Sequence, residues 1–337
     1  MTELSAESRP RLRENILHIY PDMDRANLIT PDQTFNLPTY AALAFLRMRS
    51  YCTGYHAISD IAGRSGCSIT DVIACLESLR PAGIVHTSDD REAAEVPEDE
   101  ARARLLKITD LWANELKLNY IGNELAGGRL NRDVLIGWLI EMYHYIKDFP
   151  EAIAHAARQA RGDLEPLLWK FANEERGHEV FVLATLAQLG LSRAEIEASS
   201  PMLSTRMIGV VMREMFDLEP SSVLLLAALV EAQEFDEDQV ELFKAALDTH
   251  YGIGAKSFDP YFEHQKIDFN LGHARMLEDN INLLRVKDRA VLDKIVNKLH
   301  EVKHAFDLQS MEIRQYYADL NGKYVPRQAM NFAAVQA

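Results

Sequence analysis

The stretch LEPLLWKFANEERGHEVFVLATLAQLG, residues 164–190, decides how this sequence is interpreted. Its apolar residues recur at the spacing of one helix face, which predicts a helix over 163–189. At about 100° per residue, Glu175 and His178 fall inside the apolar arc of that helix. An ionised carboxylate that faces a core is costly unless it is paired or bound to a metal. The sequence therefore predicts a polar site inside a helical domain.

Residues 101–325 around this stretch show the same helical period, and we find no strand pattern in them. Asn131 and Ser192 are predicted N-caps, and Gly190 is predicted to close the helix before it. This segment is expected to form a compact all-α domain. Its other predicted helices are 101–126, 132–147, 149–160, 193–197, 203–216, 220–233, 237–249, 257–282 and 287–320.

Composition and charge narrow the class of protein. The 337 residues carry 36 Lys and Arg against 51 Asp and Glu, a net charge of −15, and 47% are hydrophobic. Such a charge repels phosphate backbones, so no nucleic-acid partner is expected. We find no secretion signal and no apolar run of membrane-spanning length, so no membrane partner is expected. With only three cysteines, a reduced cytoplasmic protein is predicted.

The N-terminal third has a different organisation. We expect a partly ordered arm over 1–34, a small domain over 35–88 and an acidic linker over 89–100, with a C-terminal tail over 326–337. The run IAGRSGCSITDV, which starts at Ile61, and the pair Ile84–Val85 resemble a winged helix-turn-helix. Its presumed recognition helix contains Asp71 and Glu77 and no cation before its end, which argues against DNA. Similar winged folds bind peptides in some peptide-modifying systems, including pyrroloquinoline quinone biosynthesis.

Two further segments add candidate ligands to the first. In SSVLLLAALVEAQEF, residues 221–235, eight apolar residues precede Glu231 and predict a buried helix. In the segment over 258–280, His264 and Asp268 are four residues apart and share a helix face, so they can bind one metal ion. Each segment also has a simpler interpretation. For the first it is a hydrogen bond between Glu175 and His178, or a carboxylate paired with arginine. For the second it is a helix end in solvent at Glu231, and for the third a pair of His264 and Asp268 on a helix surface.

Taken together, the three segments resemble the haem-oxygenase-like di-metal oxidases and oxygenases, which share a helical fold with the TenA and PqqC proteins. The family pattern is Glu-x(2–6)-His, then a Glu, then His-x3-Asp-x2-His. The resemblance covers residues 101–325. It implies six metal ligands. They are Glu175, His178, Glu231, His264, Asp268 and, as the sixth, His273.

The sixth ligand departs from the family pattern, because Leu271 stands where that pattern has a histidine. His273 follows two residues later. In an unbroken helix it would face away from His264, so it can reach the metals only if the helix bulges or unwinds near Gly272.

The resemblance implies a non-haem di-iron oxidoreductase that uses O2. Glu175, His178 and His264 would hold one Fe(II), and Glu231, Asp268 and His273 the other, with manganese as an alternative metal. Glu175 and Glu231 are the expected catalytic carboxylates. The substrate would be an amino-acid-derived molecule, an amine or a peptide in a biosynthetic pathway, changed by N-oxygenation, C–C cleavage or desaturation. An external electron donor and a homodimer are also expected.

Two alternatives stay open: a non-metal TenA- or PqqC-like enzyme or binding protein, and a winged-helix regulator with a helical sensor domain.

Two further motifs need an interpretation. Glu141 and His144 form another Glu-x-x-His, either a supernumerary ligand or second base or, more simply, part of a helix that packs in the core. His300 and His304 form the H-E-x-x-H of zinc proteases, but their helix wheel turns both away from the apolar stripe.

Overall fold

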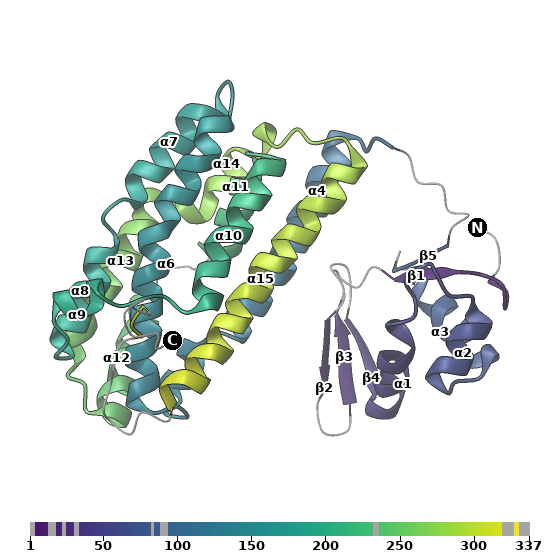
Figure 1. The fold of residues 1–337 in the computed structure, drawn as a ribbon, viewed down its shortest axis with the longest axis horizontal. Helices are drawn as coiled ribbons and strands as arrows, with labels where there is room; N and C mark the ends of the chain where they lie inside the picture. Colours follow the sequence, from purple (N-terminus) through teal and green to yellow (C-terminus); the bar gives the residue numbers. More distant parts are fainter. Residues whose placement is uncertain are drawn as a thin grey trace, which may run out of the picture. The chain divides into compact units, whose positions relative to one another are not determined.

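The computed structural model describes residues 4–12, 18–21, 25–29, 34–81, 84–87, 94–231, 236–318 and 327–329. The chain divides into two compact units, Met1–Val96 and Pro97–Ala337. Each unit is drawn in its own range of colours in Figure 1. Among the described residues, no helix is both long and apolar enough to cross a bilayer.

The first unit combines three helices with short antiparallel strands. Strand β1 pairs with β5, and β2, β3 and β4 form a second sheet in that order. The strands at residues 10–12, 18–21 and 25–29 lie in the segment expected to be an arm, where the sequence shows no clear alternation of apolar and polar residues. The elements are β1 (Pro10–Leu12), β2 (His18–Pro21), β3 (Arg25–Ile29), β4 (Thr34–Pro38), α1 (Thr39–Arg49), α2 (Ile58–Ser65), α3 (Ile69–Leu79) and β5 (Val85–Thr87).

The helices of this unit follow the sequence signals closely. Gly66 ends α2 with a left-handed conformation, and the Ser68 hydroxyl accepts a hydrogen bond from the Asp71 amide at the start of α3. The buried positions Val72, Leu76 and Leu79 of α3 pack into one apolar cluster with α1, α2 and β5.

The second unit is a bundle of helices in which the long α15 lies along α10, α6 and α4 (Figure 1). Its elements are α4 (Glu98–Leu118), α5 (Ile121–Ala126), α6 (Arg132–Gln159), α7 (Leu164–Glu175), α8 (Glu179–Gln188), α9 (Arg193–Glu197), α10 (Leu203–Leu218), α11 (Ser222–Val230), α12 (Glu237–Tyr251), η2 (Ala255–Phe258), α13 (Asp259–Leu271), η3 (His273–Arg275), α14 (Met276–Asp279), η4 (Ile281–Leu283) and α15 (Arg289–Ala318).

Helix α6 is the central helix of this bundle, and it runs as one helix where two were predicted. Pro150 lies inside it. Proline removes a backbone donor and costs about 3 kcal/mol in a helix interior. The helix nevertheless continues, because Phe149, Ala152 and Ile153 are all buried on either side of the proline. Packing therefore outweighs the local penalty.

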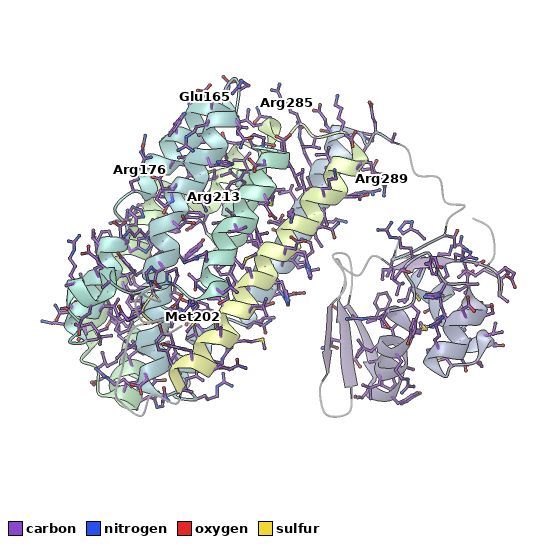
Figure 2. All side chains as sticks on the ribbon, viewed as in Figure 1. Glu165, Arg176, Met202, Arg213, Arg285 and Arg289 are labelled. Carbon is purple, nitrogen blue, oxygen red and sulfur yellow. The ribbon has the colours of Figure 1, made fainter. Side chains whose placement is uncertain are left out.

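Helix α11 has the expected all-round burial, from Val223 to Ala227. The predicted N-caps are also confirmed: the Asn131 side chain accepts from the Val134 amide, and Ser192 forms a capping box with Glu195. Met202, labelled in Figure 2, precedes α10 and is buried.

Candidate metal centre

The helix predicted over 163–189 is two helices. Helix α7 ends at Glu175, Arg176 is extended, and Gly177 has a φ of +89°. His178 is then the N-cap residue of α8. Only glycine adopts such a φ easily, so Gly177 provides the turn. The Glu175 and His178 side chains therefore meet across a helix break, although the sequence analysis placed them on one continuous helix face.

A second left-handed glycine shapes the other half of the site. Helix α13 ends at Leu271, and Gly272, with a φ of +79°, donates its N–H to the carbonyls of Asp268 and Phe269. The chain then turns into η3, where the His273 side chain is only 1% exposed, whereas Leu271 is 39% exposed. The helix thus ends at Gly272, and this break lets the His273 side chain face the protein interior.

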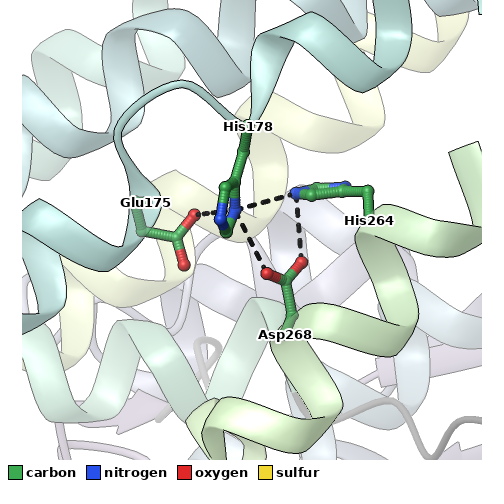
Figure 3. Close-up of side chains that lie close together, drawn as sticks. All are labelled: Glu175, His178, His264 and Asp268. Carbon is green, nitrogen blue, oxygen red and sulfur yellow. Dashed lines mark hydrogen bonds and ion pairs between the residues drawn. The ribbon is translucent and has the colours of Figure 1, made fainter. Parts of the chain in front are cut away.

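Four donor side chains converge between these two turns (Figure 3). His178 Nδ1 lies 3.4 Å from Glu175 Oε2, 3.2 Å from Asp268 Oδ1 and 3.2 Å from His264 Nε2. His264 Nε2 in turn lies 3.1 Å from Asp268 Oδ2. One ligand atom from each of the four residues lies within 4.8 Å of all the others. The arrangement brings two imidazoles and two carboxylates from α7, α8 and α13 to one point.

His273 contacts this cluster through Glu175. Its Nδ1 lies 2.9 Å from Glu175 Oε1, while its Nε2 forms a 3.3 Å hydrogen bond with Glu174 Oε2. Glu175 therefore has one oxygen toward His178 and the other toward His273. Burial acts to lower the pKa of His273, but the contacts with Glu175 and Glu174 outweigh it and raise the pKa. With a metal ion bound, the Nε2 proton would be donated to Glu174 and Nδ1 would be the ligand atom.

Glu231 lies at the end of α11, half-buried, and lines the same cavity as Glu175, His264 and Asp268. It is not among the four residues whose donor atoms converge within 4.8 Å. Burial, followed by the charges of Glu175 and Asp268, raises the pKa of Glu231 well above its usual value. A cation between these carboxylates would relieve that repulsion.

The pKa shifts of Glu175 and His178 show how the carboxylates and imidazoles of the cluster affect one another. Burial acts to raise the pKa of Glu175, but contacts with His178 and His273 outweigh it and lower the pKa to about 2. Burial acts to lower the pKa of His178, but Asp268 and Glu175 raise it to about 10. The site thus favours added positive charge at His178, whereas burial lowers the pKa of His264.

The donor atoms of the cluster fit a divalent metal. His273 Nδ1 and Glu175 Oε1 face each other at 2.9 Å, and Asp268 Oδ1 lies 3.2 Å from His178 Nδ1. Among the described residues these three buried atoms are therefore held in ion pairs and form no regular hydrogen bond. Two ligands bonded at right angles to one ion at about 2.1 Å lie about 3.0 Å apart, close to the spacings seen here. Mixed carboxylate and imidazole donors suit Fe(II) and Mn(II).

A cavity of about 240 Å³ opens beside the cluster. Glu175, Glu231, His264 and Asp268 line it, and most of the remaining wall is apolar or aromatic. Among the wall residues are Trp138, Tyr145, Phe149, Leu229, Tyr261 and Phe306. A small organic molecule in this cavity would lie next to the cluster with little surrounding water.

The other two motifs lie elsewhere. Glu141 is fully buried, and its carboxylate accepts from the Met202 amide and the hydroxyls of Thr205 and Tyr317. His300 packs on Trp112, and its ring stacks parallel to that of the exposed His304 with centroids 6.5 Å apart. Neither motif belongs to the convergent cluster.

Two residues near the cluster escaped the sequence analysis. Glu174 falls at the edge of the apolar arc of a continuous helix, and only the break after Glu175 makes its contact with His273 understandable. The helix that contains Tyr145 was interpreted as packing in the core, yet Tyr145 lines the cavity. The aromatic run around it resembles the helix that walls the substrate pocket in the haem-oxygenase-like oxidases, and this was the signal that could have found it.

Comparison with solved structures places the fold. The chain resembles a domain of unknown function with a haem-oxygenase-like fold from Shewanella denitrificans OS217, with a TM-score of 0.53 and 17% identity, over 70% of this chain and 99% of that one. It also resembles a TenA homologue from Pseudomonas syringae pv. tomato DC3000, with a TM-score of 0.50 and 11% identity, over 67% and 100%. No curated protein matches significantly. The fold is therefore all-α and haem-oxygenase-like, as predicted.

Residues 136–305, half of the chain, match the family described as iron-containing redox enzyme. This range includes both glycine turns and every candidate ligand described above. The chain therefore belongs to the family of iron-containing redox enzymes, and it is an oxidoreductase.

Proposed function

We propose that this protein is a non-haem di-iron oxidase or oxygenase that depends on O2. The observation that carries the proposal is the convergence of Glu175, His178, His264 and Asp268, each with one ligand atom within 4.8 Å of the others. Buried carboxylates and imidazoles that lie this close together are a donor set that suits Fe(II) or Mn(II). Metal ions bound between these residues would replace the ion pairs that the side chains form with one another.

The arrangement suggests a division of the ligands between two ions. Glu175, His178 and His264 would hold one ion, and Asp268, His273 and Glu231 the other. Glu175 lies between His178 and His273, which suits a carboxylate that bridges two ions. When bound, ferrous ions would supply the electrons that reduce O2.

The chain's own residues would bind and orient the substrate. The cavity of about 240 Å³ is large enough for a compact amino-acid-derived molecule or amine, or for one side chain of a peptide. Its aromatic walls would exclude water from the reacting atoms. Glu231 would contribute its carboxylate from the end of α11, in the wall of the same cavity.

Anaerobic reconstitution of the full-length protein with Fe(II) tests this proposal. We expect up to two bound irons per chain by metal analysis, and a transient absorption band near the visible range on exposure to O2. Glu141→Gln is the matched control, because that carboxylate is equally buried but already has hydrogen-bond donors. Wild-type protein that retains no iron after reconstitution would contradict the proposal.

A metal-free enzyme or binding protein of the TenA or PqqC kind is the alternative. It predicts that the buried imidazoles and carboxylates pair with one another and that chelators leave ligand binding unchanged. Ion pairs such as His273–Glu175 agree with this alternative, and the convergence of four ligand atoms within 4.8 Å of one another favours the metal.

For the N-terminal unit we propose a role in holding a peptide substrate. In the three-stranded sheet, β4 is an edge strand that pairs with β3 alone among the described strands. Extended peptides bind such edges as an added strand. Protein that lacks residues 1–96 should keep its iron and lose affinity for a peptide substrate. Equal peptide turnover by both forms would contradict this role, and a gel shift with DNA would favour the regulator.

A further inference from the structure

The side chain of Tyr145 lines the cavity from α6 and is held in place by two other aromatic rings. Its ring centroid lies 5.5 Å from that of Phe149 and 5.3 Å from that of Phe306, which approaches edge-on. Both neighbours also line the cavity. The Tyr145 ring therefore packs between two phenylalanine rings, and a phenylalanine would fit at position 145.

The hydroxyl is what sets Tyr145 apart from these neighbours. Its oxygen is buried and has no hydrogen-bond partner among the described residues. The other two tyrosines in the cavity wall are paired, because the hydroxyls of Tyr120 and Tyr261 lie 3.2 Å apart and Gln265 donates to Tyr261. On α6 itself, the Tyr143 hydroxyl accepts a hydrogen bond from Lys147. A buried unpaired hydroxyl is destabilising unless something binds to it.

The electrostatics of the cavity keep this hydroxyl protonated. Burial, and then the negative charges of Glu231 and Glu175, raise the pKa of Tyr145 well above its usual value. A phenol that keeps its proton is a hydrogen-bond donor. The same two carboxylates line the cavity with it, so Tyr145 belongs to the wall next to the proposed metal ligands.

We propose that the Tyr145 hydroxyl donates a hydrogen bond to the molecule that occupies this cavity beside the metal centre. The acceptor on that molecule would be a carbonyl oxygen or an anionic oxygen or nitrogen atom. This inference rests on the proposed function, since the centre would hold that molecule's other end. Tyr145 is then a binding residue that selects ligands with an acceptor atom on the side that faces α6.

Azide is a suitable probe, because it is a small anion whose binding to ferric iron is followed by its charge-transfer absorption. Full-length wild type, Tyr145→Phe and the control Tyr143→Phe are loaded with iron, oxidised and titrated with azide. We expect Tyr145→Phe to raise the dissociation constant about tenfold, as for the loss of one hydrogen bond to an anion. Tyr143→Phe should change it less than about twofold, because its hydroxyl contacts Lys147.

Thermal unfolding of the metal-free proteins gives a second readout. Tyr145→Phe should melt at or above the wild-type temperature, because it removes an unpaired buried hydroxyl. A clear fall would show that the hydroxyl has a structural partner and would overturn the inference. Iron loading with unchanged azide affinity in Tyr145→Phe would also overturn it and leave the proposed function intact. Wild-type protein that binds no iron would overturn both.

Discussion

Two Glu-x-x-His pairs of the bundle, Glu141–His144 and Glu175–His178, have different surroundings. Glu141 and His144 lie in the unbroken α6, where Glu141 accepts from a backbone amide and two hydroxyls and His144 contacts Ser199. Glu175 and His178 lie on either side of the turn at Gly177. The same four-residue motif thus has neutral hydrogen-bond partners in one place and belongs to a cluster of carboxylates and imidazoles in the other.

This difference teaches that the convergence of ligand side chains from separate elements, and not the motif, identifies the candidate metal site. Glu141 is no less buried than Glu175. Its neutral donors stabilise a carboxyl group without any cation, and burial raises its pKa while these hydrogen bonds oppose the rise. Around Glu175, the neighbours are themselves metal-type ligands.

The strongest test of this contrast exchanges carboxylate for amide at both glutamates. Glu175→Gln should weaken iron binding more than about 100-fold, beyond the range for residues that only support a ligand. Glu141→Gln should leave iron stoichiometry unchanged and alter stability by about 1 kcal/mol. Metal analysis after dialysis measures the first, and denaturant unfolding the second. Equal iron loss in both variants would refute the contrast.

Glu174 sharpens the comparison, because it supports the cluster without joining it. Glu174→Ala removes the acceptor for His273 Nε2, and we expect iron affinity to fall about 10- to 100-fold. Glu165→Ala, at an exposed position in the first turn of the same helix, is the control. Competition with a chelator measures both affinities. Iron affinity that is the same in the two variants would rule out a role for Glu174.

The turn at Gly177 can be tested against a similar turn elsewhere. Gly177 and Gly162 both have positive φ, and an added Cβ would meet no atom within 4 Å at either position. Alanine at each should therefore cost about 1–2 kcal/mol of stability through backbone strain alone. Only Gly177→Ala should also weaken iron binding, because it reorients His178. Comparable iron affinity in both variants would mean that the turn does not position the ligand.

The smallest expected effect concerns His144 and acidification. Burial, and then the charge of Lys147, lower the pKa of His144 to about 4 in the folded protein. The unfolded chain then binds more protons below its ordinary value near 6.5, so stability falls as the pH drops from about 6.5 towards 4. His144→Gln should remove about 1 kcal/mol of this loss at pH 5.5. Parallel stability curves for both proteins from pH 7 to 5 would contradict it.

Much of the bundle is predictable from helical period and caps, because α10, α11 and α12 obey local rules. Three features were not predictable, since each depends on tertiary packing. Packing on both sides of Pro150 carries α6 through the proline. The strands near the N-terminus pair with partners that are distant or weakly patterned. The break at Gly177 occurs in a sequence whose apolar period continues across it.

The candidate site shows the same division between local and tertiary information. Spacing alone suggested His264 and Asp268, which lie on one face of the regular helix α13. The position of His273 depends on Gly272, whose left-handed conformation was only one of the outcomes open to the sequence. Glu174 became relevant only once the position of His273 was fixed.

The two left-handed glycines also determine how this centre would be moved to another protein. Copying donor side chains onto matched heptad positions of a straight bundle would reproduce the spacing in sequence and lose the directions of two imidazoles. A graft would have to carry the segments 174–179 and 268–275 whole, each with its corner. The unit to transfer is therefore the two turns at Gly177 and Gly272 with their flanking ligands, and the helices around them could be replaced by other helices.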